Sequence, residues 1–271
     1  MKDEACIYFL QWVLPQMQLR WPGFRRVRKQ VCKRIDQRIN QLGLVDESAY
    51  RDYLLNHVSE WQILARLCHV TISRFYRDKV VFNRLESELI PRLCAQLQLR
   101  EEKYFYCWCA GCARGEEAYS LGLLWTFVLQ DRYPEVVISI TATDIEPLMI
   151  QQARKVCYPF SSVKNLAPEW RQKAFRQIND RYCLSPIYQY PVTFSVSDVE
   201  QDIDMQSYHL VLCRNLVFTY FSLERQVQFL HKLQTRLLEG GVLVLGAHER
   251  LPEGVSGWRQ WQPRLPIYVR Q

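Results

Sequence analysis

The stretch YFYCWCAGCARGEEAYSLGLL, residues 104–124, carries the pattern that decides the fold. It opens with the aromatic and apolar run typical of a buried strand, and it closes with apolar residues at helical spacing. Gly111 and Gly115 lie between the two, where glycine lets the backbone turn tightly and approach a ligand without a Cβ clash. We therefore predict a strand, a ligand-binding turn and a helix in succession.

Three cysteines in this stretch allow a second interpretation, a metal site. Cys107, Cys109 and Cys112 have the spacing C-x-C-x-x-C, and the first two would share one face of the strand. A structural zinc site needs four ligands, and paired motifs typically supply them, but no second pair lies nearby. We therefore predict no metal and expect small cysteines that fill a tight junction.

Two acidic residues at the helix start indicate the charge of the ligand. Glu116 and Glu117 would repel the phosphate that a helix N-terminus otherwise attracts. A carboxylate here suits a cationic ligand, which favours S-adenosylmethionine over NAD. Asp144, which ends the apolar run ISITATD, is placed to accept hydrogen bonds from ribose hydroxyls, although acids after strands are common.

Residues 101–271 alternate strand-like and helical patterns, which predicts a doubly wound, mostly parallel α/β sheet. We expect Gly240 and Gly241 to end the last long helix and open the next strand. A final run, PIYVR (266–270), is expected to form an edge strand. The other expected strands are YFYCWC (104–109), VVISITATD (136–144), VTFSV (192–196), YHLVLC (208–213) and VLVLGA (242–247).

Residues 1–100 show helical spacing throughout. Gly43 is placed to end a helix that begins near Phe24, and Asp46 or Ser48 is placed to cap the next helix. Pro91 is expected to bend or break the last one. We therefore predict a small all-α domain, 1–100, followed by an α/β domain, 101–271.

Composition limits the class of protein. With 48% hydrophobic and 23% charged residues, the chain resembles an ordinary globular protein. No apolar run approaches the ~20 residues that span a bilayer, so we expect no membrane insertion. The N-terminus lacks the features of a signal peptide and predicts a short amphipathic helix that ends near Pro15. Irregularly placed cysteines indicate buried thiols in a reducing compartment, and hence a cytoplasmic protein; those in apolar segments are Cys6, Cys68, Cys94, Cys157 and Cys213.

Basic residues are concentrated between Arg20 and Arg38, where Asp36 is the only acid. This basic helix is a candidate surface for an acidic protein partner or a phosphate backbone, and an ordinary solvated surface is an equally good interpretation. Only Trp21 and Phe24 are aromatic, so we do not expect nucleic acid as the partner. The basic residues are Arg20, Arg25, Arg26, Arg28, Lys29, Lys33, Arg34 and Arg38.

A series of segments, in order, resembles the chemotaxis-receptor methyltransferase (CheR) family. GCARGEEAYS (111–120) is similar to the family's cofactor-binding loop, which reads roughly G/A-C-S-T-G-E-E-P-Y-S. The resemblance runs from about residue 70 to residue 252. The other segments are TISRFYRD (71–78), ATDIEPLMIQQARKVCY (142–158), VTFSVSDV (192–199), YHLVLCRNLVFTYF (208–221) and LEGGVLVLGAHERL (238–251).

The resemblance implies a methyltransferase sheet behind a helical N-terminal domain, with S-adenosylmethionine as the cofactor. By similarity, Gly111 belongs to the cofactor loop, Glu117 holds the methionine amino group and Asp144 holds the ribose hydroxyls. Asp198 would accept a hydrogen bond from the exocyclic amine of adenine, and Val199 would contact the ring.

Further residues follow from the same resemblance. Asn215 and Leu216 would form the floor beneath the methionine part of the cofactor. Thr71 and Ser73 would close over the cofactor from the helical side. Arg77 would reach the transfer site, where a guanidinium can orient an acceptor carboxylate through two hydrogen bonds.

Some positions depart from the family pattern. Thr71 and Ser73 stand where the family has asparagine and threonine, and Asp198 replaces an asparagine. The run FTYF has one extra residue, so Thr219 occupies the expected place of the catalytic tyrosine and Tyr220 becomes the candidate. With these departures, the chain resembles a divergent member of the family.

The expected function is therefore O-methylation of a carboxylate, such as a protein glutamate, in a chemotaxis-like pathway. A carboxylate is already ionised near neutral pH, so transfer requires alignment and exclusion of water and no general base. Other acceptors, and a non-catalytic module that binds S-adenosylmethionine or its product S-adenosylhomocysteine, remain alternatives. His248 and Glu249 follow the last long strand, as loop polar groups or as contacts to substrate.

Overall fold

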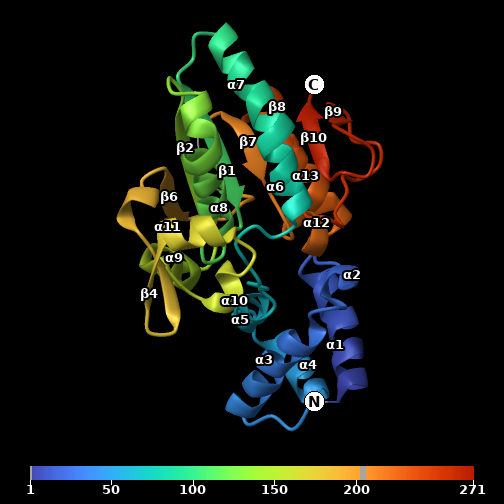
Figure 1. Ribbon diagram of the computed structural model, residues 1–271. Helices are drawn as coiled ribbons and strands as arrows, with labels where there is room; N and C mark the ends of the chain where they lie inside the picture. Colours follow the sequence, from blue (N-terminus) through green and yellow to red (C-terminus); the bar gives the residue numbers. More distant parts are fainter. Residues whose placement is uncertain (1, 202–205) are drawn as a thin grey trace. The chain divides into compact units, whose positions relative to one another are not determined.

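The chain folds into two compact units, shown in Figure 1. The computed structural model describes residues 2–201 and 206–271. The smaller unit comprises Met1–Thr71 and Thr219–Gln226, and the larger unit comprises Ile72–Phe218 and Val227–Gln271. The segment Thr219–Gln226 thus belongs to the smaller unit by its contacts, although the larger unit flanks it in sequence.

The smaller unit packs short helices around an apolar core. Leu10, Val13, Val31, Ile35 and Tyr50 are fully buried in this core, because apolar residues recur every three or four positions along each helix. The helices are α1 (Asp3–Gln16), α2 (Trp21–Phe24), α3 (Arg28–Gln41), α4 (Glu47–Asn56) and α5 (Glu60–Leu67).

Local signals set the helix ends in this unit. Gly43, just past α3, has a φ of 69°, the left-handed conformation that commonly terminates a helix. Asp46 accepts a hydrogen bond from the amide of Ala49 at 2.9 Å and caps α4. Both predictions are confirmed. The helix expected to begin near Phe24 begins instead at Arg28, because α2 forms a separate short turn.

The larger unit is built on a sheet with the strand order β6-β2-β1-β7-β8-β10-β9. Neighbouring strands from β6 to β8 are parallel, and β10 pairs antiparallel with both β8 and β9. The fold is a doubly wound, mostly parallel α/β sheet, as predicted. The strands are β1 (Tyr104–Ala110), β2 (Val137–Asp144), β6 (Val192–Val196), β7 (Tyr208–Leu212), β8 (Leu237–Val244), β9 (Trp258–Gln260) and β10 (Ile267–Arg270).

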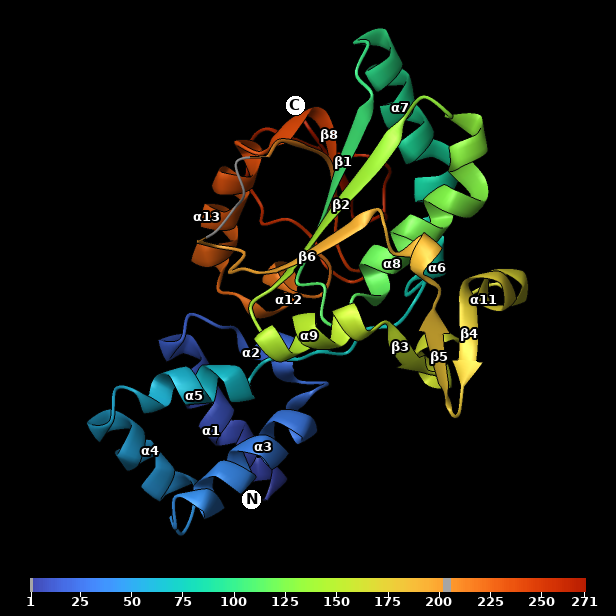
Figure 2. The same cartoon turned by 90° about the vertical axis from the view of Figure 1, so that its left-hand side faces the viewer.

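Side chains of β1 alternate between two faces that helices cover. Phe105 points to Trp125, which directly follows α8 (Glu116–Leu124), with ring centroids 5.9 Å apart. Trp108 points to the opposite face, where Phe229 of α13 (Leu223–Gln234) lies 6.5 Å away. Figure 2 shows α8 and α13 on opposite sides of the sheet.

The helices just before β1 pack in the core of the larger unit. Phe82, Leu89 and Leu93 are buried there together with β1 and α8. The division between units therefore falls after Thr71 and not near residue 100, because helical spacing does not reveal which core a helix joins. These helices are α6 (Lys79–Arg84), the π-helix η1 (Leu85–Leu89) and α7 (Ile90–Leu99), and Pro91 lies in the first turn of α7.

Two strand predictions need correction. Gly240 and Gly241 lie inside β8, beside an irregularity in the β7–β8 pairing, and do not separate that strand from α13. Gly240 has a φ of 76°, so the glycine pair accommodates a kink within the strand. Strand β10 is paired on both sides, and β9 forms the edge, because the chain turns back once more after residue 257.

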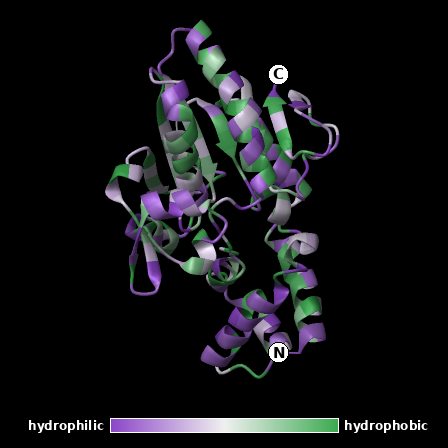
Figure 3. Ribbon diagram, in the orientation of Figure 1, coloured by the Kyte–Doolittle hydropathy of each residue, from purple (hydrophilic) through white to green (hydrophobic). Residues whose placement is uncertain are grey.

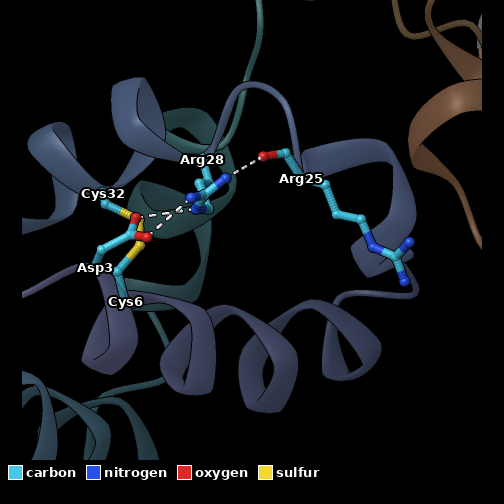
Figure 4. The surroundings of a disulfide bond; sticks show 5 residues. All are labelled: Asp3, Cys6, Arg25, Arg28 and Cys32. Atoms are coloured by element: carbon cyan, nitrogen blue, oxygen red, sulfur yellow. Dashed lines mark hydrogen bonds and ion pairs between the residues drawn. A yellow bond between two sulfur atoms is a disulfide. The ribbon is translucent and has the colours of Figure 1, made fainter.

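Four cysteines are paired in disulfides, which corrects the expectation of free thiols at Cys6 and Cys157. Cys157 and Cys183 face each other in a small antiparallel sheet with the order β3-β5-β4. Cys6 and Cys32 join α1 to α3 next to an ion pair of Asp3 and Arg28 (Figure 4). Sequence spacing gave no sign of either pairing. The small sheet consists of β3 (Cys157–Pro159), β4 (Phe175–Ile178) and β5 (Arg181–Leu184).

Hydropathy follows this architecture. In Figure 3 the central strands are mostly hydrophobic, whereas the helices of the smaller unit mix hydrophobic and hydrophilic residues. Within residues 2–201 and 206–271, no helix combines the length and the apolar character needed to cross a membrane.

Candidate functional site

The carboxyl ends of β1 and β7 mark the point where the winding of the sheet reverses. The chain runs from β1 to β2 and β6 on one side, and from β7 to β8 on the other. Ligands of open parallel sheets bind beyond such a point. The candidate site is therefore formed by the loop after β1, residues 111–115, and the loop after β7, residues 213–216.

The two glycines of the β1 loop lie too close to neighbouring side chains to be replaced by larger residues. Gly111 has a φ of 70°, and a Cβ there would lie 2.6 Å from Cδ2 of Leu216 in the β7 loop. Gly115 has a φ of 83°, and a Cβ there would lie 2.9 Å from the ring of Phe194 in β6. The loop thus packs through its backbone, with no room for side chains at these two positions.

Asp144, at the end of β2, holds the same loop. Its Oδ2 accepts a hydrogen bond from the Ala113 amide at 2.9 Å, and its Oδ1 accepts one from the Glu146 amide at 2.9 Å. Ala113 has a φ of 48°, a conformation that a non-glycine residue keeps only when its surroundings fix it. Carboxylate oxygens have more than one lone pair, so Asp144 can hold the loop and also accept from a ligand.

Glu117, in the first turn of α8, contacts the β7 loop through Arg214. Its side chain is 14% exposed, and its Oε2 accepts a hydrogen bond from Nη1 of Arg214 at 2.7 Å. Burial raises the pKa of Glu117 above its ordinary value, and the charges of Arg214 and Arg77 oppose this rise. The ionisation of this carboxyl group therefore depends on nearby arginines.

Glu116 has a different environment, although it is the adjacent residue. Its side chain is fully buried, and its Oε1 accepts hydrogen bonds from Arg114 at 3.2 Å and from Ser162 at 3.4 Å. Ser73 also hydrogen-bonds to this carboxyl group, whose pKa is raised by burial. The structure thus places Ser73 against Glu116.

The segment after Ile72 lies along the start of α8. The amide of Tyr76 donates a hydrogen bond to Ser120 Oγ at 2.9 Å. Arg77 donates to the carbonyl oxygen of Ile72 at 2.8 Å, and its charge lowers the pKa of Glu117. The structure therefore brings Arg77 close to Glu117, although the two residues are far apart in sequence.

The backbone of Asn215 is bonded to Glu249, a buried acid that follows β8. Asn215 has a φ of 56°, and its amide donates to Oε2 of Glu249 at 2.8 Å. The amide of Gly246 donates to the same oxygen at 2.6 Å, and Glu249 is only 4% exposed. The Glu249 carboxylate therefore ties the end of β7 to the end of β8.

Asp198 and Val199 follow β6 at the same edge of the sheet as Asp144. Val196, the last residue of β6, pairs with Asp144 in the β2–β6 ladder. Oδ1 of Asp198 accepts a hydrogen bond from the Glu200 amide at 2.9 Å, and Val199 is buried. The Asp198 carboxylate thus stabilises its own turn at this edge.

Two predicted site residues, Thr71 and Tyr220, belong to the smaller unit, and so does Thr219, which stands in the expected place of the catalytic tyrosine. The carbonyl oxygen of Tyr220 accepts a hydrogen bond from the Arg20 amide at 2.8 Å, and its ring lies 4.9 Å from Phe24. The geometry of the site in the larger unit does not include these residues. The assignment of Tyr220 stays a prediction.

The cysteines of the β1 stretch are buried thiols. Cys107 and Cys109 lie in β1 on the face that α8 covers, and the amide of Cys112 donates to the Thr143 carbonyl oxygen at 2.8 Å. Burial raises the pKa of all three thiols. Across the part of the chain that the structure describes, no three His, Cys, Asp or Glu residues are grouped as metal ligands.

The basic helix is less uniformly exposed than its sequence indicates. Arg28 pairs with Asp3, and Arg38 pairs at 2.8 Å with Glu60, whose side chain is 4% exposed. Arg34 donates to backbone carbonyl oxygens of residues 67 and 69. These arginines hold the smaller unit together. Arg20 is exposed but donates to the Thr219 carbonyl oxygen at 3.1 Å. The other exposed basic side chains are Arg25, Arg26, Lys29 and Lys33, and we refer to these four as the basic face.

Three features are typical of an α/β nucleoside-binding protein: the glycine turn after β1, Asp144 at the end of β2, and the acids Glu116 and Glu117 at the start of α8. The family pattern of the CheR methyltransferase, SAM binding domain, matches residues 71–263. This match covers more than half of the chain, so the chain belongs to the CheR methyltransferase family. It is an S-adenosylmethionine-dependent methyltransferase by family, and S-adenosylmethionine is its cofactor.

Relatives by sequence agree with this assignment. A chemotaxis protein methyltransferase of Listeria monocytogenes is 29% identical over 185 residues, which are 68% of this chain and 67% of that protein. One of Borreliella burgdorferi is 23% identical over 226 residues, 80% of each chain. An uncharacterized 104.1 kDa protein of Rhodobacter capsulatus is 29% identical over 82% of this chain, and the match spans only 23% of that protein's length.

Proposed function

We propose that this methyltransferase O-methylates a carboxylate, and that the acceptor is a glutamate side chain of a protein. The observation that carries the proposal is that Arg214 bonds both Glu117 and the backbone of Arg77, which brings the charge of Arg77 within reach of Glu117. Among the described residues, the guanidinium of Arg77 bonds to one carbonyl oxygen and pairs with no carboxylate. A guanidinium with free donors at the edge of a cofactor site is suited to bind an acceptor carboxylate.

The residues of the larger unit fit the cofactor. S-adenosylmethionine supplies a methyl group that its sulfonium activates for transfer. Glu117 would accept hydrogen bonds from the methionine amino group through the lone pairs that its bond to Arg214 leaves open. The bare backbone at Gly111 would let the loop approach the ligand closely. Asp144 would accept from the ribose hydroxyls through its remaining lone pairs.

The other predicted contacts are part of the same proposal. Asp198 and Val199 follow β6 at the edge that also holds Asp144, which is where the adenine would lie. Asn215 and Leu216 lie in the β7 loop, and Leu216 touches the glycine turn. They would form the floor beneath the methionine part. The roles predicted for Thr71, Ser73 and Tyr220 are kept as part of the proposal.

The chain's contribution to transfer is alignment. An acceptor carboxylate is ionised at neutral pH and is itself the nucleophile, so no residue needs to remove a proton. Arg77 would hold both oxygens of that carboxylate and direct one of them to the methyl group. Correct orientation and exclusion of water are then sufficient for a large rate enhancement.

The basic face supports an acidic protein as the partner. Arg25, Arg26, Lys29 and Lys33 are exposed on one short segment. Such a concentration of like charge attracts acidic surfaces and speeds their association. The proposal keeps a cytoplasmic location; the six free, buried cysteines fit it, and the two disulfides do not.

A methyl-ester assay tests the proposal. The purified protein is incubated with methyl-tritiated S-adenosylmethionine and bacterial lysate proteins, and volatile tritiated methanol is collected after mild alkali. Carboxyl methyl esters hydrolyse under these conditions, whereas N-methyl groups do not. We expect base-labile label in protein. Arg77→Ala should lower its rate by roughly 10²-fold, because orientation is lost, while affinity for S-adenosylhomocysteine stays near that of the wild type.

Other outcomes identify the alternatives. Protein label that resists alkali would mean another side chain as acceptor, and label only in small molecules would mean a small-molecule substrate. Binding of S-adenosylhomocysteine by calorimetry without any transfer would indicate a non-catalytic module. Each of these results contradicts glutamate methylation but not the cofactor.

A further inference from the structure

Arg214 lies at the centre of the site, although the motifs did not draw attention to it. It follows the buried strand β7 directly, and its side chain is only 2% exposed. Its Nη1 donates to Oε2 of Glu117 at 2.7 Å, and its Nη2 donates to Oδ2 of Asp78 at 2.6 Å. A buried guanidinium thus connects two carboxylates from different segments.

The same guanidinium holds the backbone of the segment that carries Arg77. Its Nη2 also donates to the carbonyl oxygen of Arg77 at 2.9 Å. Asp78 has a φ of 60° and Tyr76 one of 50°, so the backbone on both sides of Arg77 is in the left-handed region. Non-glycine residues keep this conformation only when contacts enforce it. Arg214 supplies two such contacts.

The charges around Glu117 show why the carboxylate depends on Arg214. Burial raises the pKa of Glu117, and Arg214 is the main opposing charge. Without Arg214, the carboxyl group would face burial and further acids with only Arg77 to stabilise its ionised form. The other titratable groups that act on it or share its contacts are Asp78 before α6, Cys109 on β1, Cys112 in the β1 loop, Glu116 on α8, Cys213 after β7 and Glu249 after β8.

We propose that Arg214 is the positioning residue of the site: it keeps Glu117 ionised for the cofactor's amino group and fixes the 76–78 segment that carries Arg77. The inference rests on the role proposed above for Glu117, but not on the identity of the methyl acceptor. An arginine suits this position because its donors lie on two separate Nη atoms of a planar group, whereas the three donors of a lysine ammonium all lie on one nitrogen.

The test is the pH profile of S-adenosylhomocysteine binding, measured by calorimetry from pH 5.5 to pH 7, where the ligand's amino group stays protonated. Arg214→Met removes the charge and keeps much of the apolar stem. Loss of this opposite charge should raise the pKa of the Glu117 carboxyl group further above its ordinary value. The affinity of this variant should therefore fall about tenfold for each pH unit below the new pKa. The wild-type profile should be much flatter.

A double mutant shows whether Arg214 acts through Glu117. Glu117→Gln removes the ionisable group, so its affinity should be low and independent of pH. Adding Arg214→Met to Glu117→Gln should restore no pH dependence and should lower the affinity only by the pH-independent, about tenfold loss that follows from releasing the 76–78 segment. A purely structural role for Arg214 would give the same additional loss in both backgrounds, and that result would overturn the proposal.

Arg38→Met is the matched control. Arg38 also pairs with a buried carboxylate, Glu60, but in the core of the smaller unit. This variant should lose stability and keep the wild-type pH profile of binding. An equal change of profile in both variants would mean that the effect is general loss of folding.

Arg214→Lys provides a second measurement in case the Met variant does not fold by circular dichroism. It keeps a charge near Glu117 but loses the fork of donors. We expect a pH profile close to that of the wild type and an affinity lowered about tenfold at every pH. Wild-type affinity in Arg214→Lys would contradict the proposal. If the wild type binds S-adenosylhomocysteine but makes no methyl ester, the function fails and this inference still stands.

Discussion

Single residues in this protein are constrained by backbone conformation as much as by chemistry. Ala113, Asp78 and Asn215 all have positive φ without being glycine, and each lies in or beside the candidate site. Such residues require contacts that hold them, and Asp144, Arg214 and Glu249 provide these contacts. Asp144, Arg214 and Glu249 therefore fix the backbone of the site loops without a ligand.

At the residue scale, Gly115→Ala should destabilise the protein by about 2–5 kcal/mol. A left-handed conformation costs a non-glycine residue about 1–2 kcal/mol, and overpacking against Phe194 adds about 1–3 kcal/mol. Gly254→Ala is the control, because Gly254 has a similar φ of 79° with nothing within 4 Å of its added Cβ. Urea unfolding of both variants separates the two effects. Equal losses would show that the contact with Phe194 is unimportant.

At the scale of elements, the site depends on connections between strand ends. Asp144 links β2 to the loop after β1, and Glu249 links the ends of β7 and β8. Leu216 packs on Gly111, so the two central loops also contact each other. Parallel strands end at the same edge of a sheet, which is why short loops from distant sequence positions can cooperate there.

Glu249→Ala should lower stability by about 3 kcal/mol, because it leaves two buried amides without their charged acceptor. Binding of S-adenosylhomocysteine should weaken as well, since Asn215 loses the contact that fixes its backbone. Glu249→Gln keeps an acceptor oxygen of similar shape and should cost about 1 kcal/mol. Thermal unfolding and calorimetry on both variants check this. If Ala and Gln behave alike, the carboxylate is not what holds the strand ends.

At the scale of the whole molecule, the basic residues of the smaller unit fall into two groups. Arg28, Arg34 and Arg38 stabilise the smaller unit from within, whereas the basic face is exposed. The larger unit carries the candidate cofactor site. The proposed function would use the basic face to recognise an acidic partner and the larger unit for chemistry.

Replacing Arg25, Arg26, Lys29 and Lys33 together by glutamine should weaken binding of a labelled glutamate-rich helical peptide by roughly tenfold to hundredfold. Each exposed ion pair contributes about 0.2–1 kcal/mol, and the effect should shrink as salt rises. Fluorescence anisotropy measures it. A variant with Arg100→Gln and Lys155→Gln, exposed in the larger unit, should bind the peptide as the wild type does. Unchanged binding by the fourfold variant would exclude the basic face as the docking surface.

Much of the fold followed from local pattern. The strands β1, β2, β6 and β7 lie where apolar runs predicted them, and the glycine turn lies where residues 111–115 predicted it. Local pattern did not predict the disulfide pairs or the position of Gly240 and Gly241 inside β8. It also did not predict that α6 and α7 pack in the larger unit. Each depends on which distant segment lies alongside, and periodicity carries no such information.

The sequence by itself determined the α/β class, the acidic character of the β1 turn and the resemblance that led to S-adenosylmethionine. Only the tertiary structure revealed Arg214 between Glu117 and Asp78, and Glu249 beneath Asn215. The reason is physical. Strand and helix preferences act between neighbours in the chain, whereas the charge state of a buried acid is set by whichever residues the folded sheet brings within a few ångströms of it.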